Sequence, residues 1–180
     1  MLRAWNGNYR RFMRPSNPLL AAWIISLAAA CGAIAWPGKM TQAQSISAPG
    51  AQAKTHAGTD ANQGFSEVVW QLTTSPLNIQ GCTAQWSCGP FTHTGDASFR
   101  VDTRLAIRMI SSSGTANWAA IVPSDQTNFK GGDQTASVTA QSTTTGDGQV
   151  GLTVTFVDTD FSRLAAGNYT MTVSGTISAN

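Results

Sequence analysis

The 180-residue sequence predicts an all-β domain that follows an N-terminal hydrophobic segment. From Phe65 onward, apolar and polar residues alternate with a period of two, which is typical of half-buried strands. Turns rich in Gly, Asp and Ser separate these runs, and no amphipathic helical pattern appears among them. Because a parallel sheet would need helical crossovers, we expect an antiparallel, immunoglobulin-like or Greek-key β-sandwich of about seven strands over residues 65–180.

The first 43 residues have the layout of a secretory signal. Arg3, Arg10, Arg11 and Arg14 precede an uncharged run over 17–36, and small residues follow it. We therefore predict a signal peptide over 1–43, cut after Ala43 or after Ala35. The apolar stretch 19–36 is just long enough to cross a bilayer, so an uncleaved anchor helix is the alternative. Both interpretations predict a secreted or cell-surface protein that meets the membrane only through this segment.

Net charge separates the two parts of the chain. The whole chain has a net charge of +2. The part from residue 44 onward contains six basic residues and all nine acidic residues, so its net charge is −3. A nucleic-acid-binding surface needs clustered Lys and Arg, so no nucleic-acid partner is expected. Residues 44–64 contain mainly Ala, Gly, Gln, Ser and Thr with little to bury, and we expect a disordered arm or linker there.

The alternation places the strands in order along the domain. The clearest interior strand is 99–110, where Val101, Leu105 and Ile107 share one side and Arg100, Arg104 and Arg108 share the other. Similar runs occur at 68–73, 116–122, 135–141, 150–156 and 164–180. The large side chains expected in the core are Trp70, Phe99, Trp118, Phe156 and Tyr169.

Two cysteines follow the predicted signal, Cys82 and Cys88. An exported chain with an even number of cysteines most simply forms one disulfide, which here would close a loop around Trp86. Their spacing lacks the second ligand pair of a zinc site.

Residues able to support catalysis are sparse. His56 and His93 stand apart from each other, and no serine lies in a nucleophile elbow. Asp158 and Asp160 could offer oxygens to Ca²⁺, but two carboxylates are fewer than a calcium site needs. We therefore expect no enzyme activity, no resident metal and no cofactor.

The last strand carries the pattern Leu-x-x-Gly-x-Tyr-x-x-x-Val-x-x-x-Ile over residues 164–177. This pattern resembles the final strand of bacterial exported sandwiches, among them spore coat U-type proteins and chaperone-usher pilins. The stretch "SSSGTANWAAIV" resembles a feature of WxL-type surface domains. These resemblances imply a non-enzymatic surface or fibre protein.

Two functions follow as hypotheses. The first is a structural or adhesive cell-surface protein, such as a coat or fibre subunit, whose partners are other surface proteins or copies of itself. The second is a secreted module that binds a carbohydrate or another ligand through exposed aromatic side chains, for which Trp86 and Phe91 are the candidates. A buried Trp86 favours the first function.

Overall fold

A computed structural model describes residues 22–29, 44–157 and 160–180. Within these ranges the chain forms thirteen strands and two short 3₁₀ turns, with no α-helix. The all-β, antiparallel prediction is confirmed, whereas the arrangement of about seven immunoglobulin-like strands is not. The strands are β1 (Ala22–Ala29), β2 (Ser45–Ser47), β3 (Gln52–Thr55), β4 (Gln63–Gly64), β5 (Val68–Thr73), β6 (Cys82–Cys88), β7 (Phe91–His93), β8 (Arg100–Ser112), β9 (Ala119–Val122), β10 (Ser124–Gln126), β11 (Ala136–Gln141), β12 (Gly148–Val157) and β13 (Tyr169–Ala179).

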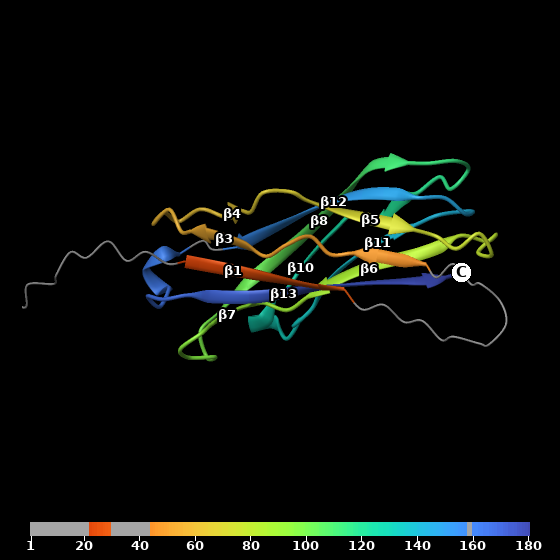
Figure 1. The fold of residues 1–180 in the computed structure, drawn as a ribbon. Helices are drawn as coiled ribbons and strands as arrows, with labels where there is room; N and C mark the ends of the chain where they lie inside the picture. Colours follow the sequence, from red (N-terminus) through yellow and green to blue (C-terminus); the bar gives the residue numbers. More distant parts are fainter. Residues whose placement is uncertain (1–21, 30–43, 158–159) are drawn as a thin grey trace, which may run out of the picture.

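The strands form one continuous ladder in the order β2-β5-β12-β8-β7-β13-β6-β11-β9. Off this path, β4 pairs with β12, β10 pairs with β8, and β1 lies between β3 and β13 (Figure 1). The pairing of β1 with β13 is parallel, and every other strand pair in the described part of the chain is antiparallel.

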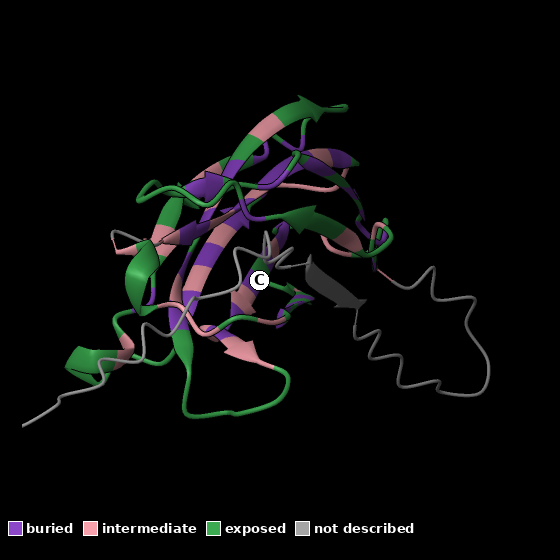
Figure 2. Cartoon of the chain, turned by 90° about the vertical axis from the view of Figure 1, so that its left-hand side faces the viewer, coloured by how far each residue is buried: buried purple, intermediate pink, exposed green. Residues whose placement is uncertain are grey.

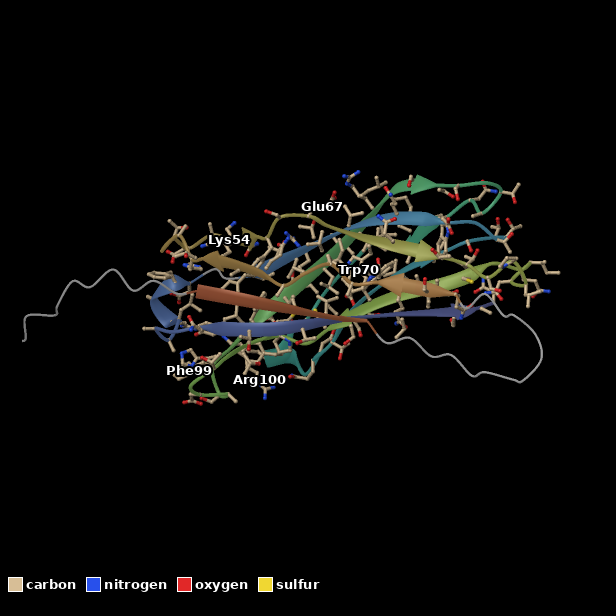
Figure 3. All side chains as sticks on the ribbon, viewed as in Figure 1. Lys54, Glu67, Trp70, Phe99 and Arg100 are labelled. Atoms are coloured by element: carbon tan, nitrogen blue, oxygen red, sulfur yellow. The ribbon has the colours of Figure 1, made fainter. Side chains whose placement is uncertain are left out.

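The hydrophobic core lies where the two halves of this ladder face each other. Trp70 on β5 meets Trp86 on β6 edge to face, with ring centroids 6.0 Å apart. Phe91 on β7 packs against Phe156 on β12 at 5.1 Å. Trp70 lies in the middle of the molecule, while Glu67 and Arg100 lie near its periphery (Figure 3). Contacts between distant strands therefore hold the two halves together.

The predicted alternation is visible as bands of buried and exposed residues along the strands (Figure 2). On β12, Val150, Leu152, Val154 and Phe156 are all buried. One expected core residue is wrong, because Phe99 is 42% exposed. It precedes the first residue of β8 and makes an edge contact with His93 instead of entering the core.

Residues 44–64, expected to be a disordered arm, contribute three short strands instead. β2 pairs with β5 and buries Ile46, and β4 pairs with β12. His56 is also buried, with its ring stacked on Phe161 at 5.0 Å. The prediction of disorder considered only the composition of this segment. The segment forms strands because strands already present in the domain supply partners for its backbone hydrogen bonds, so a few buried side chains are enough to order it.

The Leu-x-x-Gly-x-Tyr pattern builds the corner that leads into β13. The Tyr169 hydroxyl accepts a hydrogen bond from the Ala165 amide at 3.1 Å and donates one to the Ala165 carbonyl at 3.3 Å. Gly167 has φ +145°, and a Cβ atom there would lie 2.2 Å from Nε2 of His93. The glycine and the tyrosine are thus both required by the same turn.

The predicted cleavage positions after Ala35 and Ala43 lie outside the described residues. The described part of the hydrophobic segment, residues 22–29, is the strand β1 and not the expected helix. Nowhere in ranges 22–29, 44–157 and 160–180 is there a helix long and apolar enough to span a membrane.

Candidate functional site

The disulfide predicted between Cys82 and Cys88 is wrong for this fold. Both thiols are free and buried, and they stand at opposite ends of the single strand β6. Six residue steps of an extended strand separate their Cα atoms by about 20 Å, whereas a disulfide needs them closer than about 7 Å. Burial raises the pKa of the Cys82 thiol, and burial followed by the nearby Asp125 raises the pKa of Cys88 to about 12.

The two aromatic residues predicted to contact a ligand are also buried. Trp86 and Phe91 both have 0% exposure. Trp86 packs on Trp70, and Phe91 packs on Phe65 at 5.8 Å. Neither ring reaches the surface, so both serve the core. Alternation along β6 and β7 fits this position as well as it fits a surface one, which is why the sequence alone left the choice open.

The weak calcium candidates do not come together as a site. Asp158 lies outside the described residues. The Asp160 carboxylate forms an ion pair with Arg163 at 2.8 Å and accepts a hydrogen bond from the Ser162 hydroxyl. Across the described ranges, no group of three or more His, Cys, Asp or Glu residues is arranged to hold a metal ion.

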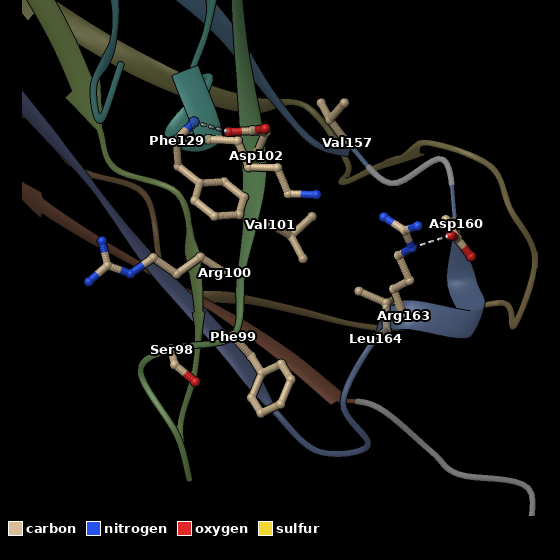
Figure 4. A pocket seen from close by; sticks show the side chains of 11 residues that line it. Ser98, Phe99, Arg100, Val101, Asp102, Phe129, Val157, Asp160, Arg163 and Leu164 are labelled. Atoms are coloured by element: carbon tan, nitrogen blue, oxygen red, sulfur yellow. Dashed lines mark hydrogen bonds and ion pairs between the residues drawn. The ribbon is translucent and has the colours of Figure 1, made fainter. Parts of the chain in front are cut away.

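A groove of about 450 Å³ lies beside the start of β8 (Figure 4). Its walls carry the exposed Phe99, the cations Arg100 and Arg163, and the carboxylates of Asp102 and Asp160. Both carboxylates already have partners, since Asp102 accepts hydrogen bonds from the Thr127 hydroxyl at 2.8 Å and the Phe129 amide at 2.9 Å. The groove could therefore hold a small ligand through aromatic and cationic contacts.

A further surface feature is an uncharged polar face on three neighbouring strands. We call it the hydroxyl face, and it consists of Thr83, Gln85 and Ser87 on β6, Ser137, Thr139 and Gln141 on β11, and Ser174, Thr176 and Ser178 on β13. All nine residues are exposed or half-buried. The ionisable side chains on these three strands are Cys82, Cys88 and Tyr169, and all three are buried.

Strand pairing arranges the hydroxyl face in three rows across the sheet. The rows are Ser174, Ser87 and Ser137; Thr176, Gln85 and Thr139; and Ser178, Thr83 and Gln141. Neighbouring positions lie about 4.8 Å apart across the strands and about 6.6 Å apart along them. Within the middle of the array the Gln85 amide donates a hydrogen bond to the Ser137 hydroxyl at 2.7 Å.

The outer surface around β8 and β12 has the opposite character. Arg104 and Arg108 project from β8, and Arg108 forms a two-pronged ion pair with Glu67 at 2.6 and 2.7 Å. The hydrogen bond from Arg108 and its positive charge lower the pKa of the Glu67 carboxyl. The pair crosses Gly151 on β12, where a Cβ atom would lie 2.5 Å from the carboxyl carbon of Glu67. This surface therefore carries charged side chains that form an ion pair, whereas the hydroxyl face carries no charged side chain.

The hydroxyl face was visible in the sequence only in part. Each of its three strands shows alternating Ser, Thr or Gln residues, and this pattern was clearest in the last strand. Nothing in the three separate runs indicates that β11, β6 and β13 are neighbours, because that depends on how the strands pair. No protein-family model, no curated protein and no solved structure matches the chain.

Proposed function

We propose that this chain is an exported cell-surface protein with a structural or adhesive role, built on a Greek-key β-sandwich and acting as a subunit of a coat or fibre. The observation that carries the proposal is the hydroxyl face, with nine uncharged donor and acceptor side chains in register on three strands. The proposal of export rests on the basic and apolar residues of the N-terminal segment.

The chemistry of the hydroxyl face suits contact with an uncharged surface. Hydroxyl and amide groups can donate and accept hydrogen bonds, so they can match the hydroxyls of a glycan or the same face of a second copy. Removing a charge from water costs far more than removing a hydroxyl that finds a new partner. A face without charges can therefore be covered at low cost over its whole area.

The tyrosine of the β13 corner supports the Greek-key part of the proposal. A tyrosine at the start of a late strand, with its hydroxyl bonded to the backbone a few residues upstream, recurs in such sandwiches. Tyr169 makes this bond to Ala165.

A second candidate function is a secreted module that binds a small ligand or carbohydrate. The observation in its favour is the groove beside β8, where Phe99 offers an exposed ring next to Arg100. For this second candidate we propose Phe99 as the ligand contact, since Trp86 and Phe91 are buried.

The test combines location with adhesion. The full chain with a C-terminal tag is expressed in a bacterial host, and intact cells are treated with a protease that cannot enter them. We expect the tag to be lost from intact cells, and we expect purified protein to sediment with an uncharged polysaccharide or to self-associate in light scattering. A tag that is protected until the cells are lysed would contradict export.

A pair of matched substitutions locates the contact. Thr176→Glu puts a charge in the middle row of the hydroxyl face, and Thr153→Glu makes the same change at a half-buried position on β12, outside the hydroxyl face. We expect the first variant to lose adhesion or association and the second to keep it. Equal binding by both variants would remove the hydroxyl face from the proposal.

A further inference from the structure

The groove beside the start of β8 gathers positive charge in a part of the chain that is otherwise acidic. Its lining includes Arg100, Lys130 and Arg163, which are three of the six basic residues from residue 44 onward. The carboxylates of Asp102 and Asp160 also line the groove. The lining side chains therefore carry a net charge of +1, although the chain from residue 44 onward carries −3.

Both carboxylates of the groove are engaged by the protein itself. Asp102 accepts hydrogen bonds from the Thr127 hydroxyl and the Phe129 amide, so it fastens the following 3₁₀ turn to β8. Asp160 pairs with Nε of Arg163 at 2.8 Å, and no other nitrogen of that guanidinium is bonded to a residue in the described ranges. The Arg163 side chain is 76% exposed, so its remaining N–H groups can donate to a ligand.

The other two cations have no carboxylate partner in the part of the chain that the structure describes. Lys130 is exposed, and its ammonium nitrogen lies 6.0 Å from the centre of the Phe129 ring. Arg100 donates only to neutral oxygens, those of the Ala97 carbonyl and the Gln134 amide, each at 3.1 Å. An anion in the groove would therefore meet positive charge that the protein does not already neutralise.

The groove also offers apolar surface to a ligand. Figure 4 shows Phe129 on one wall and Arg163 on the opposite wall, with Val101 between them. Phe99 adds an exposed ring. The volume of about 450 Å³ lies within the range of about 300–1,000 Å³ that is typical of small-ligand sites. A fitting ligand thus has an apolar face and an anionic group.

An acidic sugar combines these two properties. The C–H groups of its ring can pack on an aromatic side chain, and its carboxylate can accept hydrogen bonds from ammonium and guanidinium groups. We propose that the groove binds a uronic acid residue of a polysaccharide, with the sugar ring against Phe99 and the carboxylate toward Lys130 and Arg163. This inference rests on the second candidate function and names the ligand class for that site.

The first experiment compares two ligands that differ in charge. An oligogalacturonate and its methyl ester have the same sugar chain, but the ester has no free carboxylate. Binding to the purified full chain is measured by titration calorimetry. We expect the acid to bind at one oligosaccharide per chain, and the ester to bind about tenfold more weakly. Raising sodium chloride from about 20 mM to about 500 mM should weaken binding of the acid, because salt screens the charges.

Matched substitutions locate the carboxylate. Lys130→Gln removes one positive charge from the groove, and Lys54→Gln makes the same change at an exposed position outside it. We expect Lys130→Gln to weaken binding of the acid about fivefold, and Lys54→Gln to change it less than about twofold. Phe99→Ala should weaken binding about tenfold, because the ring contact is lost. Equal binding by the two lysine variants would overturn the placement of the carboxylate.

The outcomes separate the ligand class from the functions proposed above. If the ester bound as tightly as the acid and Phe99→Ala weakened both, the acidic class would be overturned while the groove remained a binding site. If neither oligosaccharide bound, this inference and carbohydrate binding by the groove would both be overturned. Adhesion through the hydroxyl face is measured separately with Thr176→Glu, so its failure gives a different result.

Discussion

Gly175 is the residue at which β13 depends most strictly on the absence of a side chain. The rings of Trp70 and the methyl of Ile46 occupy the space that a Cβ atom would need. We expect Gly175→Val to lower the free energy of unfolding by about 1–3 kcal/mol, as for an overpacked core. The measurement is denaturant unfolding followed by tryptophan fluorescence.

The neighbouring residue provides the control for Gly175→Val. Ser174 is exposed on the hydroxyl face, so Ser174→Val places the same side chain on the other side of the strand. We expect a change of less than about 0.5 kcal/mol there. A large loss of unfolding free energy for Ser174→Val, together with a small loss for Gly175→Val, would contradict the assignment of Gly175 to the inward face of β13 and of Ser174 to the outward face.

Tyr169 stabilises the corner before β13 through its hydroxyl group. Tyr169→Phe keeps the ring against His93 and Phe156 but removes both hydrogen bonds to Ala165. We expect a loss of about 1 kcal/mol in unfolding free energy. Thr172→Val, on the exposed side of the same strand, is the control. Unchanged stability of Tyr169→Phe would mean that the hydroxyl does not hold the corner.

The two thiols should be inert as long as the protein is folded. The pKa of Cys88 is raised to about 12, so almost none of it is thiolate at pH 8, and the thiolate is the form that iodoacetamide alkylates. We expect mass spectrometry to find both cysteines unmodified in the native protein and alkylated after denaturation. A mass lower by two hydrogens in non-reduced protein would indicate a disulfide and contradict this geometry.

The raised pKa of Cys88 also gives a pH dependence with a definite sign. The folded protein disfavours the thiolate, so the contribution of Cys88 to stability is fully present below the ordinary thiol pKa of 9.0. It is lost as the pH rises from there toward the folded value of about 12. Cys88→Ala should remove this part of the alkaline loss.

Among the strands, a substitution in β2 tests most directly whether residues 44–64 belong to the folded domain. It has only three residues, and Ile46 is the one that enters the core. We expect Ile46→Ala to cost about 2 kcal/mol, near the lower end for buried aliphatic residues because a short strand can adjust. Ala53→Gly on β3, which is exposed, is the comparison. If both variants were equally stable, residues 44–64 would contribute little to the stability of the domain, as the sequence-based prediction of a disordered arm implies.

The strands that the sequence predicted well are those with two distinct faces. In β8 the buried Val101, Leu105 and Ile107 alternate with exposed arginines, and this alternation can be interpreted only as a strand with one buried face. β2, β3 and β4 were missed because two to four residues carry no period. The strand β1 was expected as a helix, because an uncharged and mostly apolar run over 22–29 fits a strand as well as a membrane segment.

For the whole molecule, the sequence predicted what each strand buries but not which strands are neighbours. Pairing between strands distant in the chain joins the Ser, Thr and Gln residues of β6, β11 and β13 into one face. The same pairing excludes the Cys82–Cys88 disulfide, because the two cysteines are the first and last residues of one continuous strand and not the ends of a loop. The hydroxyl face therefore exists because of the order in which the strands pair, and local residue patterns do not predict that order.

The division between a charged and an uncharged surface has a consequence for the conditions under which the protein works. Contacts between ions weaken as dissolved salt screens them, whereas hydrogen bonds between neutral groups are little affected. If the hydroxyl face makes the contact, raising sodium chloride from 20 mM to 1 M should leave adhesion within about twofold, measured by sedimentation with the polysaccharide. A steep loss would point to the arginines of β8 instead. An attachment of this kind would hold equally in fresh water, brine and any medium between them.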